Sequence, residues 1–418
     1  MKSDSQKNFS VTTTGLAKHH ARLITKVALA FREIEKREEN RKTKPSIDSI
    51  PLASPDITAS EIEAVLAVLA TPNLSLGPKL KEFEEKIAAY TGTKYAVAVN
   101  SGTSALHLII KAMGIGPGDE VITTPFSFVA SSNCIIFEGA KPIFVDIDPV
   151  SYNIDPSKIE GKITPRTKAI LAVDVFGRPA DWKELHRIAK KHKLLLIEDS
   201  AEAIGSVYYG KKAGSYGDAA IFAFYPNKQI TTGEGGVITT NNSHLAELCA
   251  SMRNQGHSVR GSWLEHPRLG YNYRISDINC ALGIAQLARI DEIVTKRARV
   301  AKWYNQTLKN IPGLTVPALT MPNTKISWFV YVVRLADAYT RKDRARIMLG
   351  LKKHGIGCRE YFPVIHLQKY FREEHDHQAG SFPIAEHVSD RTIALPFHNN
   401  LSQEEVRRVA GTLKTLLA

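Results

Sequence analysis

The chain has 418 residues, of which 43% are hydrophobic, and a formal net charge of +13 at pH 7. This length allows a large buried core and indicates two folded units more readily than one, as in a soluble enzyme. Nucleic-acid binding is not indicated, because lysines and arginines are interleaved with acids and no nucleic-acid-binding module is recognisable. A basic enzyme with an anionic substrate accounts for the charge equally well.

The cysteines and the apolar runs restrict the cellular setting. Four scattered cysteines show neither zinc nor redox spacing and no disulfide pattern, so we predict no metal site and a reducing cytoplasm. No apolar run approaches the roughly 18–20 residues that span a bilayer, and VALAF near the N-terminus is too short for a signal peptide. We therefore expect neither export nor membrane insertion.

Residues 1–48 form a basic N-terminal extension. They hold eleven Lys and Arg against six Asp and Glu. Apolar residues recur at helical spacing at Leu23, Val27, Phe31 and Ile34, so the sequence predicts a helix with one narrow apolar stripe. Two interpretations stay open: a helix that docks on the body, a partner or an anionic membrane surface, or a solvated appendage.

From Ile50 onward, short β-type runs alternate with helical patterns. The runs are YAVAV, EVIT, KPIFVDI, KAILAVDV, LLLIED, AAIFAF and GGVITT, and helices are expected near residues 103–113, 127–138 and 181–192. This alternation predicts an α/β fold with a mainly parallel sheet and helices on both faces. We place a large domain at residues 49–300 and a smaller α+β domain at residues 301–418.

Two motifs follow predicted strands. In NSGTSALHL a Gly-containing turn opens a helix, where Thr103 and Ser104 could hold a phosphate; an ordinary helix cap is the alternative. In LLLIEDSAEAIG the strand delivers Asp199 to its carboxyl end, where ligands bind in open α/β sheets. A carboxylate there can pair with a protonated ring nitrogen, and Glu202 could lie beside the same ring, although a helix-capping acid gives the same pattern.

The third motif, AIFAFYPNKQITTGEGG, places Lys228 after apolar and aromatic residues, which is unusual for a solvated lysine. A lysine amine becomes a useful nucleophile when its charge is suppressed, as in a Schiff base with an aldehyde.

The three motifs in this order, together with LSLGPKLKEFE, TPFSFVAS, RNQGH, LGYNYRISDINCALG and YFPVIH, resemble the DegT/StrS-type sugar aminotransferases. These are pyridoxal-5'-phosphate (PLP) enzymes of fold type I, related to aspartate aminotransferase. The resemblance extends from about Ile50 to the C-terminus. It implies a seven-stranded sheet in the large domain.

The resemblance also implies roles for individual residues. Lys228 would form the Schiff base, Asp199 would pair with the pyridine nitrogen, and Phe128 would stack on the ring. The remaining cofactor contacts would come from Thr103 and Ser104 at the phosphate, Glu202 at the other ring face, Asn227, and Asn272 reaching across from a second subunit of a homodimer. The substrate would be met by Arg253, Tyr361 and His366, for which structural roles are the alternative.

Three positions depart from the family pattern. Ala223 lies where a serine often helps to hold the phosphate, Glu202 replaces a frequent glutamine, and Asp174 lies where a histidine is common. These changes affect details of the cofactor and substrate contacts and leave Lys228 and Asp199 unaffected.

The implied reaction is amino transfer from a donor such as L-glutamate to a nucleotide-linked keto sugar, with ping-pong kinetics. Sugar dehydratases of the family carry histidine in place of the lysine, so Lys228 argues against them. Two alternatives stay open: an aminotransferase for a non-sugar keto acid, and a PLP-binding regulatory protein that uses its N-terminal helix as a contact element.

Overall fold

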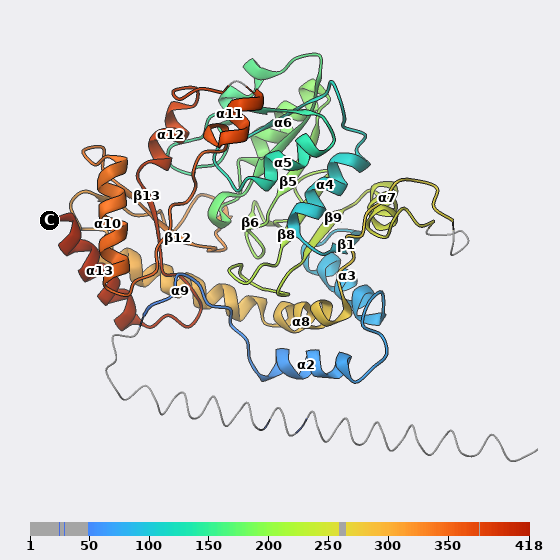
Figure 1. Cartoon of the computed structure of the whole chain (residues 1–418), viewed down its shortest axis with the longest axis horizontal. Coiled ribbons are helices and arrows are strands. Elements are labelled where there is room, and N and C mark those ends of the chain that lie inside the picture. Colours follow the sequence, from blue (N-terminus) through green and yellow to red (C-terminus); the bar gives the residue numbers. More distant parts are fainter. Residues whose placement is uncertain (1–24, 26–28, 30–48, 259–264, 376) are drawn as a thin grey trace, which may run out of the picture.

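The computed structural model describes residues 25, 29, 49–258, 265–375 and 377–418 (Figure 1). The predicted basic extension therefore lies outside the described residues, apart from Thr25 and Leu29. No helix in the described part of the chain combines the length and apolarity needed to cross a membrane.

A seven-stranded sheet forms the centre of the molecule. Its order is β1-β9-β8-β5-β4-β2-β3, in which β9 is antiparallel to both neighbours and the other pairs are parallel. The strands are β1 (Tyr95–Val99), β2 (Glu120–Thr123), β3 (Lys141–Phe144), β4 (Thr167–Val173), β5 (Leu195–Asp199), β8 (Ala219–Ala223) and β9 (Gly236–Thr240). The mainly parallel α/β sheet predicted from the sequence is confirmed.

Side chains of the central strands alternate between two hydrophobic clusters, one on each face of the sheet. In β4, Leu171 and Val173 join one cluster while Ile170 and Ala172 join the other. The first face is covered by α4 (Gly102–Ala112), α5 (Ala130–Phe137) and α7 (Ser243–Arg253), and the second by α3 (Pro78–Thr91), α6 (Trp182–His192) and α8 (Asp277–Ala288). Burial on both faces explains why these strands read as continuous apolar runs.

The helix α6 shows how the local sequence sets an element. Asp181 caps its N-terminus by accepting a hydrogen bond from the Glu184 amide, and its apolar stripe of Trp182, Leu185 and Ile188 is buried against the sheet. The helix ends at Lys193, which adopts a left-handed conformation with φ 56°. Basic residues in the last turn interact favourably with the negative end of the helix dipole.

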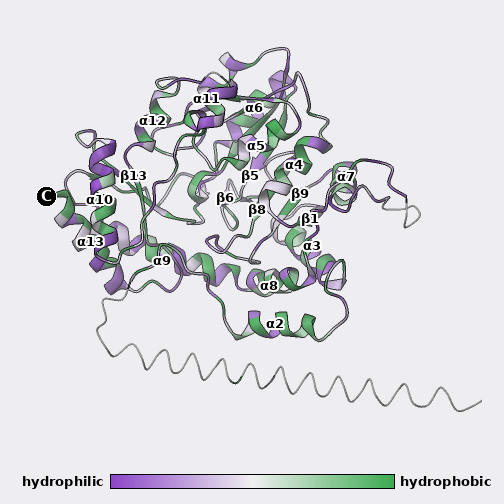
Figure 2. Cartoon of the chain, viewed as in Figure 1, coloured by the Kyte–Doolittle hydropathy of each residue, from purple (hydrophilic) through white to green (hydrophobic). Residues whose placement is uncertain are grey.

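A second, three-stranded antiparallel sheet is built from the C-terminal part of the chain. It contains β10 (Leu314–Thr315), β12 (Tyr331–Leu335) and β13 (Thr392–Leu395), and packs with α9 (Ile290–Leu308), α10 (Arg341–Lys353) and α13 (Gln403–Leu417). In Figure 1, α10 and α13 lie at the end of the molecule opposite α7. Figure 2 shows mixed polar and apolar residues on these outer helices, as expected for elements with one face in solvent.

The remaining elements are short or peripheral. The helix α2 (Ala59–Leu69) packs on the outer side of α8. The others are β6 (Val207–Tyr208), β7 (Lys211–Lys212) and β11 (Thr324–Lys325) in a third sheet, the helices α11 (Lys369–His375) and α12 (Pro383–Ser389), and the 3-10 turns η1 (Pro156–Lys158), η2 (Glu160–Lys162), η3 (Val175–Gly177) and η4 (Ile365–Leu367).

Contacts between the parts built around the two sheets cross the predicted domain boundary at residue 300. The helix α9 runs through residue 300 without a break, and Ile50 packs into the cluster of the C-terminal sheet. Conversely, Phe371 and Phe382 pack against Phe144 of β3 in the central sheet. The division into domains at residues 49–300 and 301–418 therefore stays a prediction.

Candidate active site

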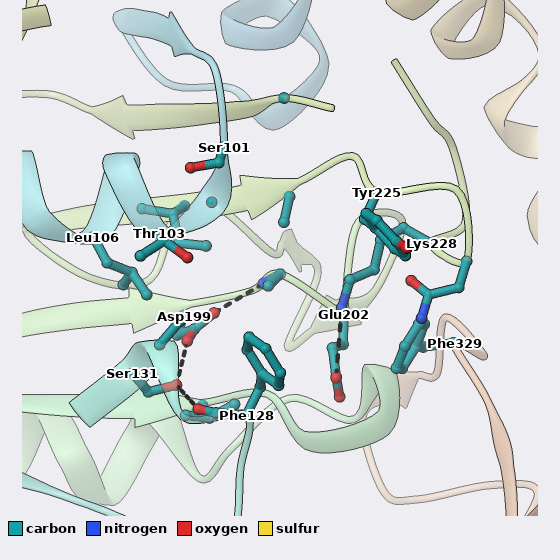
Figure 3. A pocket seen from close by; sticks show the side chains of 18 of the residues that line it. Ser101, Thr103, Leu106, Phe128, Ser131, Asp199, Glu202, Tyr225, Lys228 and Phe329 are labelled. Atoms are coloured by element: carbon teal, nitrogen blue, oxygen red, sulfur yellow. Dashed lines mark hydrogen bonds and ion pairs between the residues drawn. The ribbon is translucent and has the colours of Figure 1, made fainter. Parts of the chain in front are cut away.

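A cavity of about 420 Å³ opens at the carboxyl ends of β4, β5 and β8 (Figure 3). This is the edge at which open α/β sheets bind ligands. Its lining includes Ser101, Gly102, Thr103, Phe128, Ser131, Asp199, Glu202, Ala223, Tyr225, Asn227, Lys228, Phe329 and Tyr361. The cavity thus brings together six of the predicted cofactor and catalytic residues: Thr103, Phe128, Asp199, Glu202, Asn227 and Lys228.

Asp199 ends strand β5 and is almost fully buried. Its Oδ2 accepts a hydrogen bond of 2.7 Å from Ser131 Oγ, and its Oδ1 accepts one of 3.1 Å from the Ala201 amide (Figure 3). Burial raises the pKa of Asp199, while the Ser131 hydrogen bond and the nearby Lys228 charge partly oppose that rise. A cationic group in the cavity would therefore meet a carboxylate that two hydrogen bonds hold in a fixed orientation.

Lys228 extends into the cavity from the loop that connects β8 and β9. Its Nζ lies 3.5 Å from Glu202 Oε1 and 4.0 Å from the ring centroid of Phe329 (Figure 3). The second oxygen of Glu202 accepts a hydrogen bond of 2.9 Å from the Phe176 amide. Burial raises the pKa of Glu202, and the positive charge of Lys228 opposes that rise.

The N-terminus of α4 forms another wall. Ser101 caps this helix by accepting a hydrogen bond of 3.1 Å from the Ser104 amide, and Thr103 lines the cavity. Ser104 donates to Asn100 Oδ1 at 2.7 Å and is not part of the lining, so its predicted phosphate contact stays a prediction. A Cβ atom on Gly102 would lie only 2.7 Å from the Cβ of Ala223, so glycine allows this close approach of helix and strand.

Phe128, Asn227 and the predicted substrate residue Tyr361 also line the cavity. Phe128 is 64% exposed and faces the cavity in Figure 3, close to Asp199. Asn227 presents a buried Oδ1 that has no hydrogen-bond partner among the described residues. Burial raises the pKa of Tyr361 to about 12, which keeps its hydroxyl neutral and able to donate a hydrogen bond.

The other predicted residues lie outside the cavity. The Arg253 guanidinium donates to Glu84 Oε1 and to the Ala98 carbonyl at 2.6 Å, and so links α7 to α3 and β1. His366 is buried, and its Nε2 lies 3.0 Å from Glu386 Oε1. Asn272 is exposed and pairs through its backbone with Asn254. The roles assigned to these three residues stay predictions.

Two residues that contact the predicted groups of the cavity, Ser131 and Phe329, are not found by sequence reasoning. Ser131 holds Asp199 from the first turn of α5, and Phe329 contacts Lys228 from the segment before β12. The closeness of Ser131 to Phe128 in TPFSFVAS, within the start of the predicted helix at residues 127–138, is the only local signal for it. Phe329 lies 101 positions beyond Lys228, and no local pattern announces that contact.

These features fit pyridoxal phosphate. The cavity offers an amine, a buried carboxylate for a ring nitrogen, an exposed aromatic ring, and a helix N-terminus for an anion. The Asn227 amide at the cavity also has a buried Oδ1 without a hydrogen-bond partner among the described residues, so this side chain is available to a ligand.

A mainly parallel seven-stranded sheet with a lysine and a carboxylate at this edge defines a PLP-dependent enzyme of fold type I. The chain belongs to the DegT/DnrJ/EryC1/StrS aminotransferase family, whose model matches residues 55–414. It is a PLP-dependent sugar aminotransferase.

Known proteins support this assignment over most of the chain. GDP-perosamine synthase from Caulobacter vibrioides is 41% identical over 372 residues, which cover 88% of this chain and 98% of that protein. The PLP form of a putative sugar aminotransferase, Spr1654 from Streptococcus pneumoniae, superposes with a TM-score of 0.84 at 29% identity, over 88% of this chain and 98% of that one. DesI, solved in the presence of its TDP-sugar product, gives a TM-score of 0.81 at 30% identity, over 89% and 94% of the two chains.

Proposed function

We propose that this enzyme transfers the amino group of L-glutamate to the keto group of a nucleotide-linked sugar in the cytoplasm. The observation that carries the proposal is the convergence of Lys228, Asp199 and Glu202 in one cavity at the carboxyl edge of the sheet. The names of two similar proteins, a GDP-perosamine synthase and a DesI solved in the presence of its TDP-sugar product, support the nucleotide-linked acceptor. The net charge of +13 suits a dianionic diphosphate.

Lys228 would hold the cofactor covalently in the resting enzyme and would then act as the base that transfers a proton during the reaction. Once an amino donor has displaced it, its amine would take the proton from the donor's Cα and pass it to C4' of the cofactor. Bound PLP supplies an electron sink that stabilises negative charge at that carbon. Glu202, whose Oε1 is 3.5 Å from Nζ, would hold the displaced amine close to the reacting atoms.

The other lining residues would position the cofactor. Asp199 would bind the ring nitrogen, and the Ser131 hydroxyl would keep its carboxylate oriented. Phe128 would stack on the ring, while Thr103, Ser104 and Asn227 would bind the phosphate end together with the α4 N-terminus.

The active site would be shared between the two subunits of a homodimer. Asn272 is exposed and does not line the cavity of its own chain, so its amide would contact the cofactor bound by the other subunit. Arg253, Tyr361 and His366 are the substrate-side candidates, and of these Tyr361 alone lines the cavity of its own chain.

A donor and acceptor panel tests this proposal. The enzyme is loaded with PLP and L-glutamate, and UDP-, GDP- and TDP-linked 3- or 4-keto-deoxyhexoses and pentoses are compared with pyruvate and oxaloacetate by mass spectrometry. Amination of a nucleotide-linked sugar with ping-pong kinetics is the expected outcome. Preferential amination of a keto acid would contradict the sugar assignment. Failure of full-length protein and of a variant lacking residues 1–48 to turn over any pair would favour a regulatory protein.

A further inference from the structure

Behind the active site, three buried side chains form a hydrogen-bonded chain. Asp174 follows β4, Glu198 lies in β5, and Ser200 follows β5; all three are fully buried. Ser200 Oγ lies 2.5 Å from Asp174 Oδ2 and 2.7 Å from Glu198 Oε1. A single serine hydroxyl therefore bridges two carboxyl groups.

The number of protons shared by Asp174, Ser200 and Glu198 decides the charge of this hydrogen-bonded group. A serine hydroxyl carries one proton and can donate to only one of its two carboxyl neighbours. The other short oxygen–oxygen contact needs a proton of its own, which one of the two carboxyl groups must supply. If both carboxyl groups were ionised, one contact would place two lone pairs against each other in a buried site.

The remaining partners identify the proton-bearing carboxyl group. Glu198 accepts at Oε1 from the Gly214 amide, and at Oε2 from the amides of Tyr216 at 2.7 Å and Gly217 at 3.3 Å. Burial raises the pKa of Glu198 to about 7, and the three amide donors oppose that rise, so they favour its ionised form. Asp174 accepts at Oδ1 from the Ala180 amide and Trp182 Nε1, whereas its Oδ2 contacts only Ser200 among the described residues.

We propose that Asp174 is a protonated acid whose proton is donated to Ser200, which in turn donates to Glu198, and that this chain positions Asp199 for the cofactor. Burial, with the adjacent charge of Glu198, raises the pKa of Asp174 well above its usual range, in agreement with this assignment. Glu198 and Asp199 are consecutive residues of β5, so their side chains point to opposite faces of the sheet. The hydrogen-bonded group of Asp174, Ser200 and Glu198 therefore supports Asp199 from the side away from the cavity.

Backbone contacts carry the effect to the cavity. The Asp174 amide donates to the Asp199 carbonyl at 3.0 Å, and the Phe176 amide in the same turn donates to Glu202. The turn that begins at Asp174 therefore contacts the backbone of Asp199 and the carboxylate of Glu202. The positioning role rests on the proposed function, whereas the protonation state of Asp174 does not.

Two amide substitutions distinguish the proposed proton positions. In Asp174→Asn, Nδ2 can donate to Ser200 as the acid does, and Oδ1 keeps its two donors, so we expect a melting temperature within about 2 °C of wild type. In Glu198→Gln, the new NH₂ group meets N–H or O–H donors on either side, so we expect a fall of about 5 °C or more. The reverse order of the two variants would overturn the assignment.

Infrared spectroscopy of the purified protein, with or without added PLP, gives a readout that does not depend on stability, turnover or cofactor binding. The difference spectrum between wild type and Asp174→Asn at pH 7.5 should contain the carbonyl band of a protonated carboxyl group. A difference spectrum with ionised carboxylate bands alone would overturn the proposal, even if Glu198→Gln failed to fold.

The positioning role has its own measurement. With ¹⁵N-labelled PLP bound, the ring-nitrogen resonance should match wild type in Asp174→Asn and change in Ser200→Ala, in which the bridge is broken. An unchanged resonance in Ser200→Ala would show that the chain does not position Asp199. Absence of PLP binding by wild type would refute the proposed function and leave the infrared result valid.

Discussion

The Nζ atom of Lys228 lies 3.5 Å from Oε1 of Glu202, on the same cavity wall as the ring of Phe329. Lys228→Arg keeps the positive charge beside Glu202 but cannot give up a proton at ordinary pH. We expect this variant to fold normally and to lose activity on the order of 10⁴-fold, because both covalent binding and proton transfer require a free amine.

Borohydride reduction of the PLP-loaded protein checks this expectation. Wild type should gain one cofactor mass on the peptide that contains Lys228, and Lys228→Arg should gain none there. A labelled peptide elsewhere in wild type would contradict the assignment of the lysine.

Asp199→Asn should lower the activity of the enzyme but raise the stability of the cofactor-free protein at pH 8. Activity should fall by about 10²- to 10³-fold, because an amide cannot provide the ionic partner for a ring nitrogen.

Burial raises the pKa of Asp199, so the folded state binds its proton more tightly than the unfolded state does. The ionised carboxylate therefore lowers stability at pH 8. The variant should raise the unfolding free energy of the cofactor-free protein at pH 8, with the gain shrinking as the pH falls and the wild-type acid is protonated. A loss of stability at pH 8 would contradict this account.

Much of this site could be predicted from the sequence, for identifiable physical reasons. Asp199 ends one predicted strand and Thr103 follows another, and the alternation of strands with helices predicts a mainly parallel sheet, whose strands end at the same edge. Phe329 could not be placed in this way, because it lies just before β12 of the C-terminal sheet but packs into the cluster of the central sheet, beside Lys228. The substrate role of Arg253 is implied by the family resemblance, and nothing in the RNQGH motif indicates its contact with Glu84.

A buried ion cluster far from the cavity predicts the response to acid. Arg289 contacts Asp56 at 3.3 Å and Glu61 at 2.9 Å. Burial raises the pKa of both acids, but their hydrogen bonds and the charge of Arg289 lower it by more, with a net decrease. Their contribution to stability is therefore fully present above the ordinary values of 3.8 and 4.5, and is lost as the pH falls through the lower folded values.

Arg289→Met tests that cluster. We expect a loss of about 2 kcal/mol of unfolding free energy at pH 7, measured by urea denaturation, because two buried carboxylates lose a partner. The difference from wild type should shrink at acid pH, once both acids are protonated. The matched control is Arg187→Met, which removes an exposed ion pair with Glu184 and should change stability little. Equal effects of the two variants would contradict the account of the cluster.

Mixing two inactive variants tests the shared active site. Lys228→Ala and Asn272→Ala chains each lack one proposed group, and a mixed dimer contains one site with both. Random re-association should recover about one quarter of wild-type activity, because half of the dimers are mixed and each has one complete site. A mixture no more active than the separate variants would place Asn272 outside the partner's site.

The measurement that tests the central claim most directly is the absorption spectrum of the PLP-loaded enzyme, recorded before and after L-glutamate and then after a nucleotide-linked keto sugar. The account predicts a band from the lysine-bound cofactor that glutamate converts to the pyridoxamine form and the keto sugar restores, with neither change in Lys228→Ala. A wild-type spectrum that shows no bound cofactor, or a bound cofactor that no amino donor changes, would contradict the account.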